Sequence, residues 1–479
     1  MVSEDPTTII SKASWVIYWD WEKNRHRYGR DLDVVFKGNT IQYVGSEYRG
    51  KADRRVDGNG ILVMPGLIDL HCHLFGGSVD KGVFDDIGAK ALYGHALYTY
   101  SPLLQVWEEE GEATVEGALC ELIQSGTTTV VDISRNYPGK MELLDRSGLR
   151  VYVGESFRQA RWIDVEGRAV EYQWNEEAGW EGLSKAIRTV EALGKHPSGR
   201  LRGIIMPAQA DTCKADLIKE AFKQAQILDV PFHIHAAQTL IEVHEIVRRH
   251  GMSPIQWLEE LEVLGSRTTL GHCIFVDHHP WSPFRSEEDL RRLSRYGVTV
   301  AHCPTVFART GMTLHTFGKY RKAGVNLGIG TDSYPYNMLE EVRNTVLFAR
   351  TTGRSVFDTS TSEAFHAATV GGARALLRDD LGKIAPGCKA DLVLVDLSHP
   401  SMQPVHDPLR SLVYVAADRA VKDVYIDGNH VLKDGRLLTL DWATSKRKEQ
   451  EVQNAVLQRV SRLDPKGRSI LEIAPLSLD

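Results

Sequence analysis

Five residues that can bind a metal ion stand at the ends of short apolar runs in this chain: His71, His73, His235, His272 and Asp332. Imidazole nitrogens and a carboxylate oxygen can hold a divalent transition metal and leave one position open for water. A metal ion in such a site lowers the pKa of the water and makes it a nucleophile near neutral pH. The residue types therefore favour a hydrolase that uses a metal ion.

The spacing of these residues predicts the elements that position them. His71 and His73 are two residues apart, and alternate residues of a strand point to the same face. The apolar runs that end at His235, His272 and Asp332 have the length of buried strands. Because the carboxyl ends of the strands of a parallel barrel meet at one face, we expect the five side chains to converge there.

The middle of the chain alternates between buried-strand runs and helical stretches. The strand runs are residues 127–132, 150–154, 201–206, 232–235, 268–272, 298–302 and 325–331. The helical stretches are residues 109–125, 180–193, 214–228, 241–250, 286–296 and 338–352. Such alternation predicts parallel strands with right-handed crossovers, and the number of units favours a (β/α)8 barrel over an open sheet.

Both ends of the chain have the short strands and turn residues of a β-rich domain. We expect residues 1–63 and 385–440 to form one small β-sandwich and residues 64–384 to form the barrel. Residues 441–479 would form a C-terminal helix and tail. Val452, Val456 and Val460 give that helix an apolar side, which predicts packing on a surface or a partner.

Composition and charge exclude several classes of protein. The chain has 479 residues, 42% hydrophobic and 25% charged, with a formal net charge of -6, so no basic excess favours nucleic acid or a membrane surface. The six cysteines are scattered, and the start of the chain lacks the build of a signal peptide. These features predict a cytoplasmic enzyme with a small-molecule substrate.

Several motifs occur in a specific order along nearly the whole chain. They are PGLIDLHCH at 65–73, GTTT at 126–129, HIHAA at 233–237, GHC at 271–273, AHCP at 301–304, GTDS at 330–333 and GKIAPGCKADL at 382–392. Together they resemble the amidohydrolase superfamily, in the metal-dependent branch that contains cytosine deaminase and the s-triazine chlorohydrolases.

The resemblance implies a role for each strand-end residue. The metal ligands would be His71, His73, His235 and Asp332. His272 would polarise the substrate or hold the attacking water, and Asp332 would also pass a proton from that water to the leaving group. Superfamily members with two metals usually carry a lysine at the end of the fourth strand; residues 201–208 contain none. The expected cofactor is therefore one divalent ion per subunit, zinc first, with iron, cobalt or manganese as alternatives.

Two more histidines and one loop complete the predicted site. His233 is expected behind the ligands, and His302, at the end of another strand, is expected either behind them or in contact with substrate. The long segment 74–102 and residues 157–162 are rich in aromatic residues and would form walls of the substrate cavity. The resemblance also implies a homodimer or a higher homo-oligomer.

Gln238 departs from the pattern of the relatives. Members of this branch that act on heterocycles usually carry a glutamate three residues after the third histidine ligand, and it protonates a ring nitrogen. Glutamine has no acidic proton to give. We therefore expect Gln238 to contact substrate without acting as an acid.

Three hypotheses for the function follow from this site. The first is a hydrolase of a C–N or C–S bond in an amide, urea, carbamate or thiocarbamate, similar to phenylurea hydrolases and molinate hydrolase. The alternative is a hydrolytic deaminase or dechlorinase of an s-triazine, pyrimidine or purine, in which another group compensates for Gln238. A non-enzymatic scaffold is disfavoured because all four ligand positions are filled.

Overall fold

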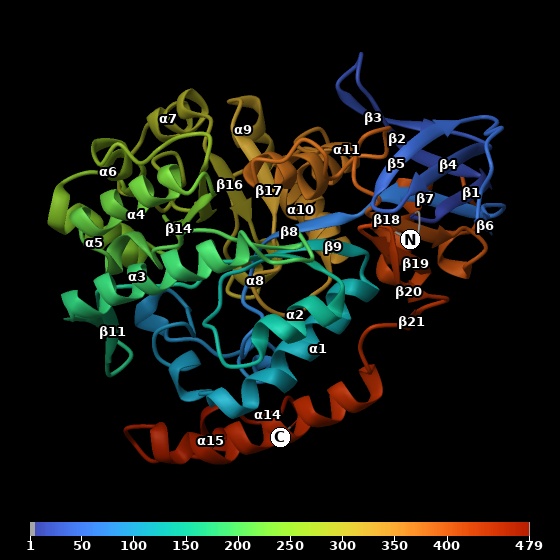
Figure 1. Ribbon diagram of the computed structural model, residues 1–479. Coiled ribbons are helices and arrows are strands. Elements are labelled where there is room, and N and C mark those ends of the chain that lie inside the picture. Colours follow the sequence, from blue (N-terminus) through green and yellow to red (C-terminus); the bar gives the residue numbers. More distant parts are fainter. Residues whose placement is uncertain (1–4, 479) are drawn as a thin grey trace.

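The computed structural model describes residues 5–478, and these residues contain a closed barrel of parallel strands (Figure 1). The barrel strands are β8 (Leu67–Cys72), β9 (Thr127–Asp132), β10 (Arg150–Val153), β13 (Leu201–Gly203), β14 (Phe232–Ala236), β15 (Thr268–His272), β16 (Thr299–His302) and β17 (Asn326–Ile329). Their spatial order is β13-β10-β9-β8-β17-β16-β15-β14. Parallel bridges from Ile205 to Phe232 and from Gln209 to His235 close the ring. The predicted fold class is confirmed.

Helices surround the barrel on its outer side (Figure 1). They are α1 (Gly111–Gln124), α2 (Lys140–Ser147), α3 (Glu176–Leu193), α4 (Ala215–Ile227), α5 (Leu240–His250), α6 (Pro254–Glu260), α7 (Glu288–Tyr296), α9 (Phe317–Lys322), α10 (Met338–Gly353), α11 (Thr361–His366) and α12 (Gly372–Ala375). Each of the six predicted helical stretches overlaps one of them. Their apolar sides pack on the barrel, as the helical period of the sequence indicates. The short helix α8 (Pro304–Ala308) follows β16 at the carboxyl end of the strands.

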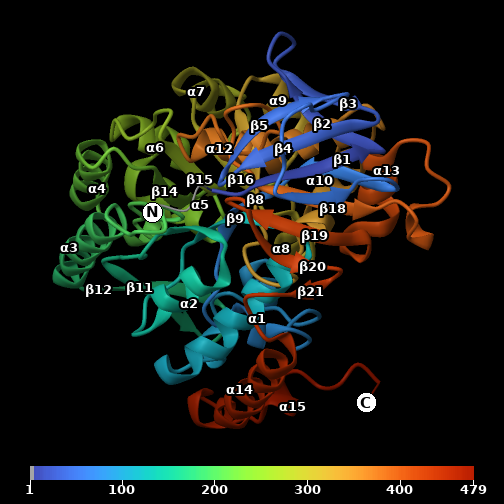
Figure 2. The same ribbon diagram turned by 45° about the vertical axis from the view of Figure 1, so that its right-hand side comes forward.

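A β-sandwich lies beside the barrel and is built from both parts of the chain that the sequence indicates (Figure 2). One sheet contains β1 (Thr7–Ala13), β4 (Leu32–Lys37), β5 (Thr40–Gly45) and β6 (Arg54–Asp57). The other contains β2 (Trp15–Asp20), β3 (Arg25–Gly29), β7 (Ile61–Pro65), β18 (Leu392–Asp396), β19 (Val421–Ile426), β20 (Asn429–Lys433) and β21 (Arg436–Leu437). The domain boundaries that we predict from the sequence stay a proposal, and residues 1–4 and 479 lie outside the described residues.

One glycine joins the sandwich to the first barrel strand. β7 pairs with β18 in the sandwich, and β8 begins two residues after β7 ends, with Gly66 between them. A Cβ atom at Gly66 would lie 2.1 Å from Oγ1 of Thr128 on the neighbouring strand. The close approach of two strands therefore requires glycine at this position, which explains its place in the motif.

The C-terminal helix α14 (Trp442–Leu463) packs against α1 and against the segment that follows β8 (Figures 1 and 2). Val452, Val456 and Val460 form one apolar cluster with residues of that segment, among them Phe84 and Leu104. The short helix α15 (Ile470–Ile473) adds Ile473 to the same cluster. The predicted apolar side of the helix thus packs within the chain.

A hairpin that the sequence analysis did not predict follows β10. Its strands are β11 (Ala160–Val165) and β12 (Ala169–Trp174), which pair along their whole length. The buried carboxylate of Asp211 accepts hydrogen bonds from Nε1 of Trp162, at 2.8 Å, and from the hydroxyl of Tyr172, at 2.7 Å. These two bonds hold the hairpin to the barrel. Among the described residues, no helix is both long and apolar enough to cross a membrane.

Candidate metal centre and active site

The ends of four barrel strands bring the predicted ligands together. One potential ligand atom from each of His71, His235 and His272 lies within 4.8 Å of the other two. The same holds for His71, His73 and Asp332. His71 belongs to both groups, so the five side chains form one cluster at the carboxyl end of the barrel, as their positions in the sequence predict.

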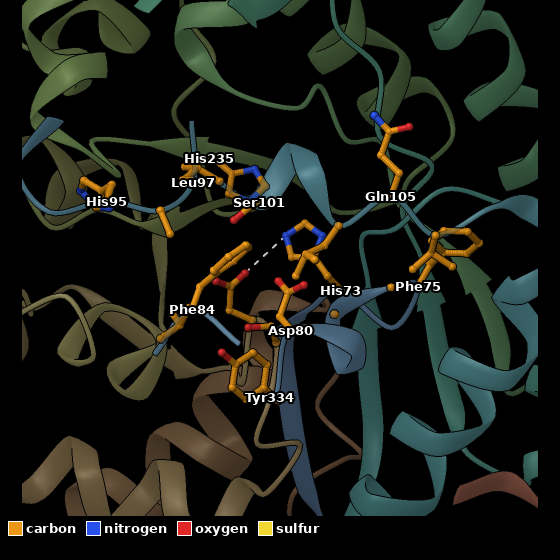
Figure 3. A pocket seen from close by; sticks show the side chains of 18 of the residues that line it. His73, Phe75, Asp80, Phe84, His95, Leu97, Ser101, Gln105, His235 and Tyr334 are labelled. Carbon is orange, nitrogen blue, oxygen red and sulfur yellow. Dashed lines mark ion pairs between the residues drawn. The ribbon is translucent and has the colours of Figure 1, made fainter. Parts of the chain in front are cut away.

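Asp332 stands between the two histidines of the first strand. Its Oδ1 atom lies 3.4 Å from Nε2 of His71 and 3.3 Å from Nε2 of His73. The rings of His73 and His235 are stacked with centroids 5.8 Å apart, and both appear in the close view of the cavity (Figure 3). One carboxylate oxygen and several imidazole nitrogens therefore face a common point.

Hydrogen bonds on the side of the His71 and His235 rings away from the cluster determine which ring nitrogen is free to bind a metal ion. Nδ1 of His235 donates to the carbonyl of Ala208 at 2.6 Å, which leaves Nε2 as a lone-pair donor. Nδ1 of His71 lies 2.8 Å from Nε2 of His233. Nε2 of His71 is buried and has no hydrogen-bond partner among the described residues. A metal ion would satisfy this nitrogen, so the residues fit the expected cofactor.

The protonation states suit a metal site. Burial lowers the pKa values of His235 and His272 well below the ordinary histidine value, so both rings are neutral. Burial alone would raise the pKa of Asp332, but the close imidazole rings of His71 and His73, with Nε2 atoms 3.4 Å and 3.3 Å from its Oδ1 atom, outweigh it and hold that pKa well below the ordinary value. Neutral imidazoles with an ionised carboxylate are a donor set for zinc, iron, cobalt or manganese.

Three residues at the site have left-handed backbone conformations that are uncommon outside glycine. The φ angles are 68° at His272, 61° at Asp332 and 51° at Ala237. Hydrogen bonds hold two of them in place: the backbone N–H of Asp332 donates to the carbonyl of His71 at 2.7 Å, and that of Ala237 donates to the carboxylate of Glu242 at 2.7 Å. Strained residues held in this way are typical of functional sites.

The remaining predicted residues lie at different depths. Gln238 lines the cavity, and its Oε1 atom is buried without a hydrogen-bond partner among the described residues. The backbone N–H of Gln238 donates to Oε2 of Glu242 at 2.7 Å. His302 is buried with its ring centroid 5.7 Å from that of Phe317, and it is not among the residues that line the cavity. The structure therefore brings Gln238, and not His302, to the cavity.

A cavity of about 830 Å³ opens over the cluster (Figure 3). His73, His235, His272 and Asp332 all contribute to its lining. The predicted walls contribute Phe75, Phe84 and His95 from the segment after β8, and Arg158 and Trp162 from the segment after β10. Both loop segments thus form part of the site, and their aromatic residues give it an apolar surface.

Other cavity residues were not predicted from the sequence. Phe307 packs against His272, with ring centroids 4.6 Å apart, and Arg309 and Asp80 line the same cavity. Asp80 follows His73 by seven residues in a loop that has no motif. Only the length of that loop could have indicated that it contributes polar residues to the site.

The C-terminal helix supports the rim of the cavity. Arg459 of α14 donates to both carboxylate oxygens of Glu110 at 2.7 Å and to the carbonyl of Gln105 at 3.0 Å. Its guanidinium carbon lies 3.9 Å from the ring centroid of Trp107. Gln105 and Trp107 line the cavity, so one arginine holds several residues of its rim.

Curated relatives are similar to this chain over most of its length. A 5-methylthioadenosine/S-adenosylhomocysteine deaminase of Natronomonas pharaonis is 29% identical over 451 residues, which cover 91% of this chain and 95% of the relative. The protein of the same name from Thermococcus kodakarensis is 30% identical, covering 85% and 92%. A 5'-deoxyadenosine deaminase of Methanothermobacter thermautotrophicus is 29% identical, covering 85% and 91%.

Solved structures share the fold. An adenosine deaminase from Xanthomonas campestris with bound zinc has a TM-score of 0.80 and 24% identity, covering 94% of this chain and 98% of its own. Triazine hydrolase from Arthrobacter aurescens has a TM-score of 0.81 and 21% identity, covering 94% and 100%. The family model described as the amidohydrolase family matches residues 62–431, which include every predicted ligand. The chain belongs to the amidohydrolase family, and it is a hydrolase that acts on carbon–nitrogen bonds.

Proposed function

We propose that this amidohydrolase uses one divalent metal ion to hydrolyse a C–N bond at an acyclic carbonyl, in an amide, urea or carbamate. A thiocarbamate, with cleavage of its C–S bond, belongs to the same proposal. The observation that carries it is the position of Gln238, which lines the cavity beside His235 and has no acidic proton. Protonation of a heterocycle is not a task that this side chain can perform.

The ligands in this proposal are His71, His73, His235 and Asp332, whose donor atoms and hydrogen bonds fit a metal. When bound, the metal would supply a Lewis acid that polarises the carbonyl and lowers the pKa of water. Zinc is the metal that we propose, supported by the zinc bound to the related fold from Xanthomonas campestris. A homodimer or higher assembly and a cytoplasmic location are further parts of the proposal.

Asp332 and His272 would handle the proton and the substrate oxygen. The carboxylate of Asp332 would accept a proton from the attacking water and return it to the departing nitrogen. His272 has a buried Nδ1 atom without a hydrogen-bond partner among the described residues, and Phe307 packs on its ring. A hydrogen bond from this ring would stabilise the oxyanion that forms when the carbonyl is attacked.

Hydrolytic deamination of an N-heterocycle is the second candidate. The names of the curated relatives favour it, since they deaminate adenosine derivatives. In this case a group other than Gln238 would have to protonate the ring. Both candidates use the same proposed metal ligands and differ in the leaving group. Hydrolysis of a heterocycle releases ammonia or chloride, whereas cleavage at an acyclic carbonyl releases an amine or a thiol.

Product analysis by mass spectrometry separates the two candidates. Enzyme with a measured metal content would be incubated with anilides, phenylureas, carbamates, thiocarbamates and N-heterocycles. We expect release of an amine or thiol from an acyclic carbonyl. Replacement of a ring amino group or chlorine by hydroxyl, without acyclic cleavage, would contradict the first candidate and establish the second.

A further inference from the structure

Asp80 places a carboxyl group in the wall of the cavity without a partner. It is the last residue of the short helical turn Gly77–Asp80, and it lines the same cavity as His73, Phe84 and Tyr334 (Figure 3). No hydrogen bond or ion pair within residues 5–478 joins its carboxyl group to another side chain. The nearby charges that affect it are those of Arg309 and Asp85.

The neighbouring acid, Asp85, is by contrast fully engaged. Its carboxylate lies 3.1 Å from Nη1 of Arg309, accepts a hydrogen bond from the hydroxyl of Tyr334 at 3.0 Å, and accepts another from the amide of Gly82 at 3.0 Å. Arg309 also donates to the carbonyl of Tyr334 at 3.0 Å. These contacts commit Arg309, the arginine whose charge acts on Asp80, to Asp85.

The local charges therefore do not cancel. Asp85 and Arg309 form a neutral pair, and an ionised Asp80 leaves one negative charge at this wall. Burial raises the pKa of Asp80 to about 7, which shows how poorly its surroundings stabilise the charge. A ligand that brings one positive charge and N–H donors would balance this charge and give the carboxylate hydrogen-bond donors.

We propose that Asp80 determines substrate specificity by binding a protonated amino group of the substrate, while the bond to be cleaved lies at the metal ligands. The inference rests on the proposed function, because it names a substrate class for the same cavity: amides, ureas or carbamates that carry an amino group. Phe84 and Tyr334 line the cavity with Asp80 and would contact the apolar part of such a molecule.

Equilibrium binding of a matched pair of probes tests this proposal. Benzylammonium and benzyl alcohol have the same ring and similar size, but only the first is a cation at pH 8. Their dissociation constants would be measured by calorimetry with zinc-loaded enzyme, for the unchanged chain, for Asp80→Asn and for Asp86→Asn. Asp86 is exposed on the same loop outside the cavity, so its variant controls for the loss of one negative charge.

We expect Asp80→Asn to weaken the binding of benzylammonium about tenfold or more, with benzyl alcohol changed less than about twofold. Asp86→Asn should leave both constants unchanged. Equal binding of benzylammonium to the unchanged chain and to Asp80→Asn would overturn the proposal. Equal loss for both probes would also overturn it, because Asp80 would then accept hydrogen bonds without preference for a cation.

The test does not depend on turnover. If no acyclic substrate is cleaved but the probes discriminate, the proposed reaction fails and the role of Asp80 stands as a cation site. If acyclic substrates are cleaved and the probes do not discriminate, only the role of Asp80 fails. A KM that rises in Asp80→Asn for amino-bearing substrates, and not for their neutral analogues, would connect the two results.

Discussion

Nδ1 of His71 and Nε2 of His233 lie 2.8 Å apart, and both rings are buried. If His71 binds metal through Nε2, its Nδ1 carries the proton and donates it to His233. Replacing His233 with phenylalanine keeps a ring in place but removes the acceptor. We expect the affinity for zinc to fall about 10- to 100-fold, the usual cost of losing such a partner. Competition with a chromophoric chelator measures it.

His302→Phe is the matched control for that variant. His302 is also a buried barrel histidine, but no hydrogen bond from its side chain reaches another described residue. The His302→Phe variant should bind zinc with an affinity within about twofold of that of the unchanged chain. A folded His233→Phe protein with unaltered zinc affinity would show that His233 does not orient His71.

His73→Ala removes a proposed ligand whose side chain is partly exposed to the cavity. Because the side chain reaches solvent, its truncation should leave the fold intact while activity and bound metal are lost. Metal content by mass spectrometry of the digested protein and the far-UV spectrum would be recorded together. Full activity of a metal-free variant would contradict the proposed chemistry.

Gln238→Glu places an acid at the position where members of this branch that act on heterocycles usually carry a glutamate. Since Gln238 lines the cavity, we expect the variant to gain hydrolysis of N-heterocycles and to lose at least part of its activity on acyclic substrates. Initial rates on one substrate of each kind measure the change. Identical kinetics on both would mean that this side chain does not contact substrate.

Asp80→Asn should stabilise the protein at high pH. Because burial raises the pKa of Asp80 from 3.8 to about 7 in the folded state, the carboxyl makes folding less favourable as the pH rises through this range. The variant lacks this cost, so the difference between its free energy of unfolding and that of the unchanged chain should grow by about 1–2 kcal/mol between pH 5 and pH 8. This is less than the whole pKa shift would give, because water reaches the cavity and screens the charge. Denaturant unfolding at both pH values measures it, and a pH-independent difference would contradict the burial of the charge.

Arg459→Ala should loosen the rim of the cavity. Loss of the bonds to Glu110 and Gln105 should raise KM about fivefold while kcat and metal content stay nearly constant, since the ligands lie elsewhere. The KM of Arg459→Lys should lie between that of the unchanged chain and that of Arg459→Ala. Arg447→Ala, an exposed position of the same helix, is the control. A fall in metal content in Arg459→Ala would indicate wider unfolding instead.

The sequence predicts those parts of the molecule that follow from a periodic local pattern and from the place of a residue at the end of a strand. The barrel follows from buried strands alternating with helices, and His71 and His73 lie together because strand geometry leaves no other arrangement. The convergence of His235, His272 and Asp332 follows from the meeting of strand ends in any such barrel. These positions depend on the class of fold and on little else.

Contacts between distant loops could not be predicted in the same way. Nothing near Arg459 indicates that its side chain will reach Glu110, because 349 residues separate them and loop positions have no period. The hairpin β11–β12 was missed because its strands carry charged residues between the apolar ones, and its contacts, such as those of Trp162 and Val170 with Leu92 and Tyr98, join it to a distant loop. Asp80 was missed because a single aspartate in a loop has no pattern, and only its lack of a partner in three dimensions identifies it.

The support that α14 gives to the cavity also bears on the order of synthesis. Every barrel strand precedes this helix in the chain, so the proposed metal ligands leave the ribosome before Arg459, which holds the rim. The part of the rim that Arg459 braces is therefore the last part of the site to be completed during synthesis.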